Sequence, residues 1–178
     1  VSVIGIGKLG LCFALTAEQA GYNVFGVDVC SAYTNSINNK KFRSDEFGVD
    51  ELLLNSSNFK SGINIEEAIN FSDYIFCFVA TPSLENGRYD HGQIDRVVDE
   101  LISFGVQDQK KHFIIGCTVM PGYCDEVFDK MRDYNYSVSY NPEFIAQGTI
   151  IRDQKRPDMV LVGSMDDSCS LFLEKMYD

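Results

Sequence analysis

Apolar runs recur along the chain with a spacing typical of strands that alternate with helices. Strands buried on both faces are mostly apolar throughout, without the strict alternation of a strand that has one face in water. Six runs have this character, VSVIGIG (1–7), YNVFGVD (22–28), YIFCFVA (74–80), HFIIGCTV (112–119), YSVSY (136–140) and DMVLVG (158–163). Together they predict a parallel sheet covered on both sides.

Between these runs, apolar residues recur every three to four positions, which predicts amphipathic helices. Pro121 suits the first turn of one helix, and Ser164 with Asp167 is close to a capping box before another. The four stripes are Leu9, Phe13, Ala17 and Ala20; Ile94, Val97, Val98, Leu101 and Ile102; Cys124, Val127, Phe128 and Met131; and Cys169, Phe172, Leu173 and Met176. Alternating strands and helices predict a doubly wound α/β fold, a mostly parallel Rossmann-type sheet with helices on both faces.

Two stretches interrupt this alternation. Residues 31–60 are rich in Ser and Asn and have room for two short helices, and TPSLENGRYDHGQ (81–93) follows a strand as a long loop. Ligands of open α/β sheets bind at the carboxyl ends of the strands, so the second stretch is expected near a binding site.

Composition narrows the class of protein. The chain has 178 residues, 45% of them hydrophobic, which is enough for the core of one soluble domain. Its net charge of −11, with only short basic clusters at 40–42 and 152–156, argues against a nucleic-acid partner. The six cysteines form no Cys-x-x-Cys pair, which favours reduced thiols in the cytoplasm and no metal site. The apolar runs are too short to span a bilayer, so no membrane association is expected.

The first strand leads into a glycine motif. Gly5, Gly7 and Gly10 form Gly-x-Gly-x-x-Gly between a predicted strand and a predicted helix, and Asp28 ends the next strand 18 residues after Gly10. In a dinucleotide site these glycines allow the turn, the approach of the pyrophosphate and the packing of the helix, while the carboxylate binds the ribose hydroxyls. A carboxylate at position 28 would repel a 2′-phosphate, which favours NAD over NADP. A tight turn without a ligand is the alternative.

Three further stretches carry a resemblance to a known family. VATPS (79–83), CTVMPGYCDEV (117–127) and NPEFIAQGTIIRDQKRPDMVLVG (141–163), with the glycine motif, resemble the amino-terminal domain of the UDP-glucose/GDP-mannose dehydrogenase family. The resemblance covers essentially the whole chain. It implies an NAD-binding domain at 1–178 and, downstream of it, a dimerisation helix and a domain that binds the sugar nucleotide.

The resemblance also implies an activity. Enzymes of this family oxidise the C6 alcohol of a UDP- or GDP-hexose to the uronate with two NAD, through a thioester on a cysteine, and pair as homodimers. Thr118 and Glu143 would then position or activate the water that hydrolyses the thioester, with Gln147 beside them. The implied cofactor contacts are Gly5, Gly7, Lys8, Leu9, Gly10, Asp28, Val79, Thr81, Pro82 and Thr118. In a purely structural interpretation, Thr118 caps the helix near Pro121 and Glu143 lies at a helix start.

The chain departs from the family pattern at several positions. Gln147 stands where a Glu is usual, and Met159 where an Arg is common. Without the charge of a second carboxylate, Glu143 should stay ionised to lower pH than in relatives that have both. None of the six cysteines has the sequence context of the family's nucleophile, although Cys117 is expected to lie nearest the cleft.

Two other functions stay open on the sequence. One is a catalytically silent NAD-binding module that senses or scaffolds. The other is the NAD-binding domain of a 3-hydroxyacid-type dehydrogenase, which shares the glycine motif but is not expected to carry NPEFIAQG (141–148).

Overall fold

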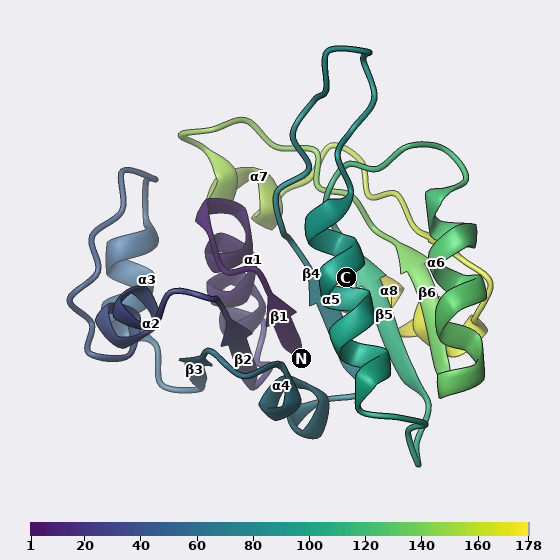
Figure 1. Cartoon of the computed structure of the whole chain (residues 1–178). Helices are drawn as coiled ribbons and strands as arrows, with labels where there is room; N and C mark the ends of the chain where they lie inside the picture. The colour runs from purple at the N-terminus through teal and green to yellow at the C-terminus, as the bar shows by residue number, and fades with distance from the viewer. Residues whose placement is uncertain (178) are drawn as a thin grey trace.

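A computed structural model describes residues 1–177 as a seven-stranded sheet between two layers of helices (Figure 1). The strands are ordered β3-β2-β1-β4-β5-β6-β7, and all pairs are parallel except β6 with β7. In chain order the elements are β1 (Ser2–Ile4), α1 (Lys8–Gln19), β2 (Val24–Val27), α2 (Ser31–Asn38), α3 (Val49–Asn55), β3 (Phe59–Gly62), α4 (Ile65–Phe71), β4 (Tyr74–Cys77), α5 (Gly92–Ser103), β5 (Lys111–Ile115), α6 (Tyr123–Met131), a 3₁₀ turn (Arg132–Tyr134), β6 (Tyr136–Tyr140), α7 (Ile150–Lys155), β7 (Gly163–Ser164) and α8 (Asp167–Tyr177). This order is that of a doubly wound sheet, which confirms the predicted fold class.

Successive strand residues point to opposite faces of the sheet and fill two separate cores. On β1, Val3 packs into one core and Ile4 into the other; on β4, Phe76 and Ile75 divide in the same way. The first core is closed by α1, α2, α3, α7 and α8, and the second by α4, α5 and α6. In Figure 1, α5 lies in front of the sheet and α8 behind it.

The helix stripes predicted from the sequence face the cores, except that Ala20 is exposed and follows the end of α1. Ile94, Val97, Val98 and Leu101 of α5 are all buried, and so are Cys169 and Leu173 of α8. Helix α6 begins at Tyr123 after Gly122. Pro121 therefore precedes the helix, and the prediction that it lies in the first turn is wrong. None of the helices within residues 1–177 is long and apolar enough to cross a membrane.

The predicted strand at 158–163 is wrong. Only Gly163 and Ser164 pair with β6, and the apolar side chains of residues 159–162 are between 38% and 53% exposed. An apolar run of this length fits a strand, but within residues 1–177 its pairing with β6 begins only at Gly163. The sequence also missed β3, because its four residues FKSG alternate between buried and exposed positions and lie in the Ser- and Asn-rich stretch.

The long loop predicted at 81–93 does follow β4, but it ends two residues earlier than predicted, since α5 begins at Gly92. Its first part forms a hairpin in which Ser83 and Tyr89 pair, and it projects beyond the sheet at the top of Figure 1. Leu84 and Asp90 each donate a backbone hydrogen bond across the hairpin, to Arg88 and Pro82 respectively. The two short helices expected in 31–60 are α2 and α3.

Candidate functional site

The three glycines lie where β1 turns into α1, and each has a different structural constraint. Gly5 has φ +84°, which favours glycine, and its N–H donates to the carbonyl of Val27 at 2.8 Å. A Cβ on Gly10 would lie 2.0 Å from the Gly5 oxygen, so only glycine lets the helix approach this closely. A Cβ on Gly7 would meet nothing within 4 Å. The open space beside Gly7 is where a ligand can approach the backbone at the start of α1.

Asp28 follows directly after β2 and is brought beside the glycine turn. The register pairs Ile4 with Val27, so the two strands end together and their next residues are neighbours. Oδ1 of Asp28 accepts a hydrogen bond from the N–H of Cys30 at 3.1 Å, and the side chain is partly exposed. The second carboxylate oxygen, Oδ2, is therefore free to accept from a hydroxyl in the cleft.

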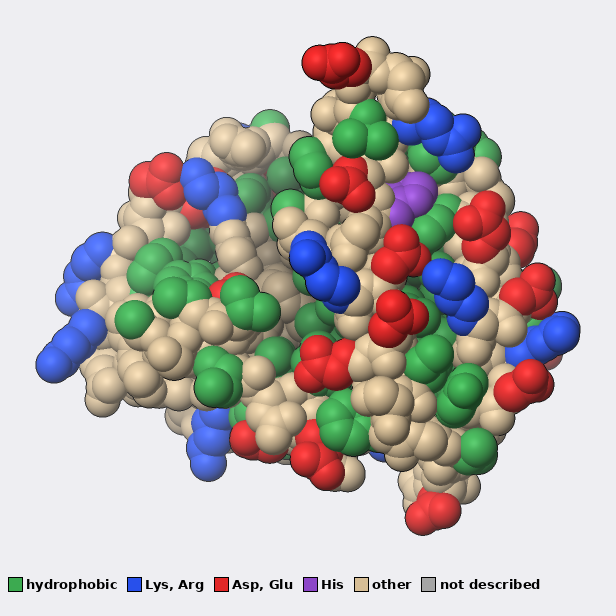
Figure 2. All heavy atoms as spheres, viewed as in Figure 1, with side chains coloured by type: hydrophobic (Ala, Val, Ile, Leu, Met, Phe, Trp, Pro, Cys, Tyr) green, Lys and Arg blue, Asp and Glu red, His purple; other side chains and the backbone are tan. Residues whose placement is uncertain are grey.

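A cleft of about 870 Å³ opens at this edge of the sheet. Figure 2 shows the face hollowed between the side that carries α2 and α3 and the side that carries α5. The cleft size is in the range of cofactor sites. The predicted cofactor residues that line it are Gly5, Gly7, Lys8, Leu9, Asp28 and Val79.

Four predicted cofactor residues do not line the cleft. Gly10 lies beneath the turn, where its role is helix packing. Thr81, Pro82 and Thr118 lie further along the loops after β4 and β5 and are absent from the lining. Cys117 does line the cleft, as expected of the cysteine nearest to it, and is 8% exposed.

Helix α5 adds residues that sequence reasoning missed. Gln93, Arg96 and Glu100 line the cleft together with apolar side chains. Their spacing of three to four residues on a helix that follows the long loop is a signal that could have identified this face. The apolar lining includes Val97 of α5, together with Ile63 and Ile65 at the start of α4.

Lys8 is the first residue of α1, at the positive end of the helix dipole. Its Nζ donates to Oδ2 of Asp45 at 2.9 Å, and this hydrogen bond raises the pKa of Lys8. Both side chains face solvent, so the pair can rearrange when an anion binds at the helix start.

The loop after β6, residues 141–149, carries Glu143 and Gln147. The hydroxyl of Tyr177 lies 2.8 Å from Oδ1 of Asn141 and 3.3 Å from Oε1 of Glu143. Burial raises the pKa of Glu143 to about 7, and the hydrogen bond with Tyr177 opposes this shift. At neutral pH this carboxyl is thus poised to accept or release a proton.

The environments of the two loop residues differ from expectation. Gln147 is exposed, whereas Glu143 is partly buried. Burial shifts the pKa of Glu143 upward, opposite in direction to the effect expected from the missing neighbouring charge. How Glu143 compares with relatives that have two carboxylates stays a prediction.

The two structural interpretations are both wrong. The helix after β5 is capped by Gly122 without a side-chain hydrogen bond, so Thr118 does not cap it. Thr118 itself is exposed. Glu143 is seven residues before the start of α7 at Ile150, so it does not lie at a helix start.

His91 connects the loops that follow β4 and β5. Its Nε2 accepts a hydrogen bond from the N–H of Met120 at 3.2 Å, and its ring packs on Tyr123 with centroids 3.7 Å apart. The loop with Thr118 is therefore held from the start of α5. Within residues 1–177, no three His, Cys, Asp or Glu side chains gather closely enough to hold a metal ion.

Comparison with known proteins agrees with this geometry. The family model for the NAD-binding domain of UDP-glucose/GDP-mannose dehydrogenases matches residues 1–178 of the sequence. The chain belongs to this family. Its cofactor is therefore NAD, and the site fits it: Asp28 offers a free carboxylate oxygen, and the open backbone at Gly7 and the start of α1 offer N–H donors for phosphates.

Named relatives of this dehydrogenase domain cover nearly the whole chain. GDP-mannose 6-dehydrogenase of Pseudomonas aeruginosa is 30% identical over 99% of this chain and 43% of its own length. UDP-glucose 6-dehydrogenase of Rickettsia prowazekii is 31% identical over 99% of this chain and 42% of its own length. The chain thus spans less than half the length of these relatives.

Solved structures separate this family from other dehydrogenases. The ternary complex of GDP-mannose dehydrogenase from Pseudomonas aeruginosa matches with a TM-score of 0.92 at 29% identity, over 99% of this chain and 43% of that one. A 3-hydroxyisobutyrate dehydrogenase from Salmonella typhimurium matches with a TM-score of 0.67 at 13% identity, over 99% of this chain and 52% of that one. This match shows a shared fold alone. The 3-hydroxyacid alternative is therefore not favoured.

Proposed function

We propose that this chain is the NAD-binding domain of an enzyme that oxidises the C6 alcohol of a UDP- or GDP-hexose to the uronate with two NAD. The relatives that support this are named as GDP-mannose and UDP-glucose 6-dehydrogenases. The observation that carries the proposal is that Asp28 and the glycine turn line one cleft at the carboxyl edge of the sheet. NAD bound there would accept the hydride that leaves the substrate carbon.

Each predicted site residue has a task in this proposal. Asp28 accepts hydrogen bonds from the adenosine ribose, and the start of α1, with Gly7, Lys8 and Leu9, binds the pyrophosphate. Thr81, Pro82 and Thr118 lie toward the nicotinamide, on loops that follow β4 and β5.

The loop after β6 supplies the proton acceptor. Glu143, with a pKa near 7, takes a proton from the water that hydrolyses the thioester, and Thr118 orients that water. Gln147 provides hydrogen bonds without charge. In this assignment turnover depends on one carboxylate.

The remaining parts of the enzyme lie outside this chain. We assign the nucleotide-sugar site and the dimerisation helix to residues downstream, since the relatives are more than twice as long as this chain. The protein then acts as a homodimer in the cytoplasm, on a small nucleotide-sugar substrate.

Two measurements test the proposal. The isolated chain should bind NAD in calorimetry and form no NADH with UDP-glucose or GDP-mannose; sustained NADH formation would contradict the domain assignment. In the full-length protein, Glu143→Gln should slow release of the uronate more than NAD binding, so that a covalent sugar adduct accumulates and appears by intact mass.

The matched control is Gln147→Glu, which changes a neighbouring loop residue. It should keep turnover and shift its pH dependence. Unimpaired turnover of Glu143→Gln without an adduct would remove Glu143 from catalysis, and a full-length protein that binds NAD but turns over no nucleotide sugar would be a silent module.

A further inference from the structure

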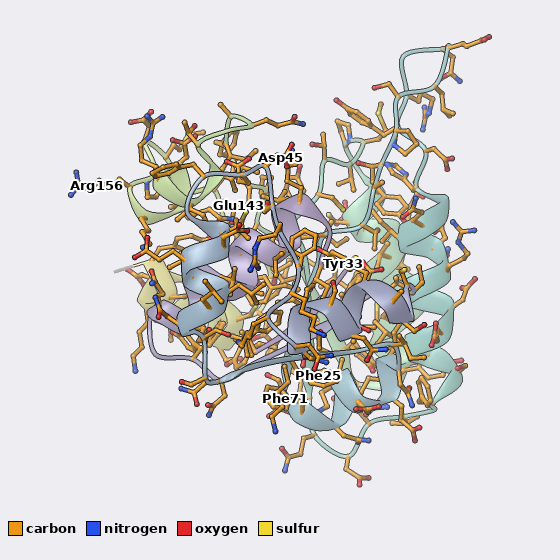
Figure 3. The ribbon with its side chains drawn as sticks, turned by 90° about the vertical axis from the view of Figure 1, so that its left-hand side faces the viewer. Phe25, Tyr33, Asp45, Phe71, Glu143 and Arg156 are labelled. Carbon is orange, nitrogen blue, oxygen red and sulfur yellow. The ribbon has the colours of Figure 1, made fainter. Side chains whose placement is uncertain are left out.

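The segment 43–48 lies between α2 and α3 and makes two contacts with functional parts of the molecule. Asp45 binds Lys8 at the start of α1, and the next residue, Glu46, reaches the loop after β6. Figure 3 shows Asp45 and Glu143 at the same end of the molecule. Adjacent acidic residues thus contact the phosphate-binding turn and the loop that carries Glu143.

Glu46 is a buried carboxylate, only 3% exposed. Its Oε2 accepts the N–H of Gly148 and its Oε1 the N–H of Ile150, both at 2.8 Å and across more than 100 residues of sequence. Hydrogen bonds to an ionised acceptor are among the stronger ones in proteins. Within residues 1–177 neither amide has another acceptor, so loss of the carboxylate would leave both without a partner.

A second acidic residue, Asp153 of α7, also holds this loop. Asp153 accepts the N–H of Ala146 at 3.1 Å and the hydroxyl of Thr149 at 2.8 Å, which fixes the loop end to the first turn of α7. Gly148 has φ +92°, a conformation that glycine adopts easily and that side chains resist. Glu46 therefore holds Gly148, which lies five residues after Glu143 and seven after Asn141 in the same loop.

Asp45 extends the connection to the cofactor cleft. Its carboxylate is bound to Lys8, and Lys8 lines the cleft at the helix start where an anionic pyrophosphate would lie. The ammonium of Lys8 has three donors and can bind a phosphate oxygen while it keeps Asp45. A bound pyrophosphate would thus order Lys8, Asp45 and the segment that follows.

We propose that segment 43–48 couples the two sites: Glu46 is a positioning residue for the loop that carries Glu143, and the Lys8–Asp45 pair links occupancy of the cleft to that loop. Glu46 touches no reacting atom in this scheme. It acts through the backbone of Gly148 and Ile150. The coupling between the cleft and the loop rests on the proposed function. The two hydrogen bonds from the loop to Glu46 do not depend on that function.

The first experiment measures amide hydrogen exchange by NMR in the isolated chain. In Glu46→Gln, the amides of Gly148 and Ile150 should exchange about tenfold faster or more, because one oxygen can no longer accept. Amides of β1 and β4 should change little. Unchanged exchange at the two amides in a folded variant would overturn the positioning role.

The matched control is Glu18→Gln. Glu18 also accepts two backbone N–H groups from a distant segment, those of Ser57 and Asn58, but at the other end of α1. This variant should leave Gly148 and Ile150 unaffected. If Glu46→Gln does not fold, Glu46→Asp keeps the charge with a shorter reach and should give a smaller acceleration at the same two amides.

The second experiment adds NAD. In the unmodified chain, NAD should slow exchange at Gly148 and Ile150 by about fivefold. By linkage, this fivefold factor is the upper limit by which opening of the loop in Glu46→Gln can weaken NAD binding. Asp45→Asn, at a side chain that is 80% exposed, should fold normally and lose the NAD effect on the loop. An NAD effect that persists in Asp45→Asn would overturn the link through Lys8.

Turnover of the full-length protein provides the third measurement, which rests on the proposed function. Glu46→Gln should lower kcat and change its pH profile, because Glu143 is displaced, while Glu18→Gln should do neither. If the full-length protein has no dehydrogenase activity at all, the proposed function fails, but the exchange result for Glu46 stands.

Discussion

The turn at residues 4–10 and the loop at 141–149 both follow parallel strands at the carboxyl edge of the sheet, but they are held differently. The turn is fixed by its own backbone, through the positive φ of Gly5 and the close approach of Gly10 to the Gly5 oxygen. The loop is fixed by Glu46 and Tyr177, whose partners in it lie between 34 and 104 residues away in sequence. A local motif therefore specifies the first region, and tertiary contacts specify the second.

The carboxylates of the two regions also differ in their surroundings. Asp28 lies at the cleft surface, where one oxygen stays available to a ligand. Glu143 packs beside Tyr177, and burial raises its pKa to about 7. The first arrangement suits binding of hydroxyl groups of a ligand, and the second suits transfer of a proton.

The largest expected effect breaks the turn itself. Gly10→Ala places a Cβ against the backbone oxygen of Gly5, so the helix must move, and we expect a loss of about 3 kcal/mol or more in the free energy of unfolding. Gly7→Ala, in open space, should cost less than about 1 kcal/mol of stability and still weaken NAD binding. Urea unfolding and calorimetry measure the two quantities. If Gly10→Ala and Gly7→Ala lower the free energy of unfolding equally, the close contact between position 10 and the Gly5 oxygen does not determine the stability of the turn.

The next effect concerns the ligand of the turn region. Asp28→Ala should weaken NAD binding by about 1–3 kcal/mol, the range for loss of hydrogen bonds to a charged group, and should reduce discrimination against NADP. Calorimetry with both dinucleotides measures it. Asp28→Asn is the control, since it keeps an acceptor for the N–H of Cys30 but removes the charge. Unchanged NAD affinity in Asp28→Ala would exclude Asp28 from the site.

The sequence predicts the turn region well because its constraints are local. Gly5, Gly7, Gly10 and Asp28 are spaced by the geometry of one strand, one helix and the next strand, and this spacing is visible in the chain. Family resemblance then identified the NAD-binding domain, which the family model confirms.

The sequence predicts less of the second region because its contacts are long-range. Nothing near Glu46 in the sequence indicates that it is buried against Gly148, and nothing near Glu143 shows that Tyr177 covers it. The apolar run at 159–162 fits a strand, yet pairing depends on a neighbouring strand that the run itself cannot specify. Periodicity identifies buried faces but not the partners that bury them.

The pH dependence of the free energy of unfolding tests the effect of burial on the Glu143 carboxylate. The pKa of Glu143 is raised from its ordinary value of 4.5 to about 7, so between these values the folded protein holds a proton that the unfolded chain has lost. This group's contribution is therefore greatest below pH 4.5 and is lost as pH rises to about 7, by about 3 kcal/mol in total.

Urea unfolding at about pH 5 and pH 8 measures this change. Glu143→Gln should remove this part of the decline, while other titrating groups contribute equally to both proteins and cancel in the comparison. Identical pH profiles for the two proteins would mean that Glu143 is solvated and that burial does not set its pKa.

The smallest expected effect concerns the apolar run that is not a strand. Val162 is 38% exposed, whereas Val138 on β6 is 7% exposed and belongs to the second core. The same change, Val→Ala, removes two methyl groups at each position, so the difference in cost reports packing alone. Val138→Ala should lower the free energy of unfolding by about 2 kcal/mol, from lost burial plus a small cavity, and Val162→Ala by less than about 0.5 kcal/mol. Urea unfolding of both variants of this chain checks the pair. If Val162→Ala lowers the free energy of unfolding as much as Val138→Ala, the segment at 159–162 packs as tightly as a strand. The apolar pattern would then predict its burial correctly, although the segment does not pair as a strand.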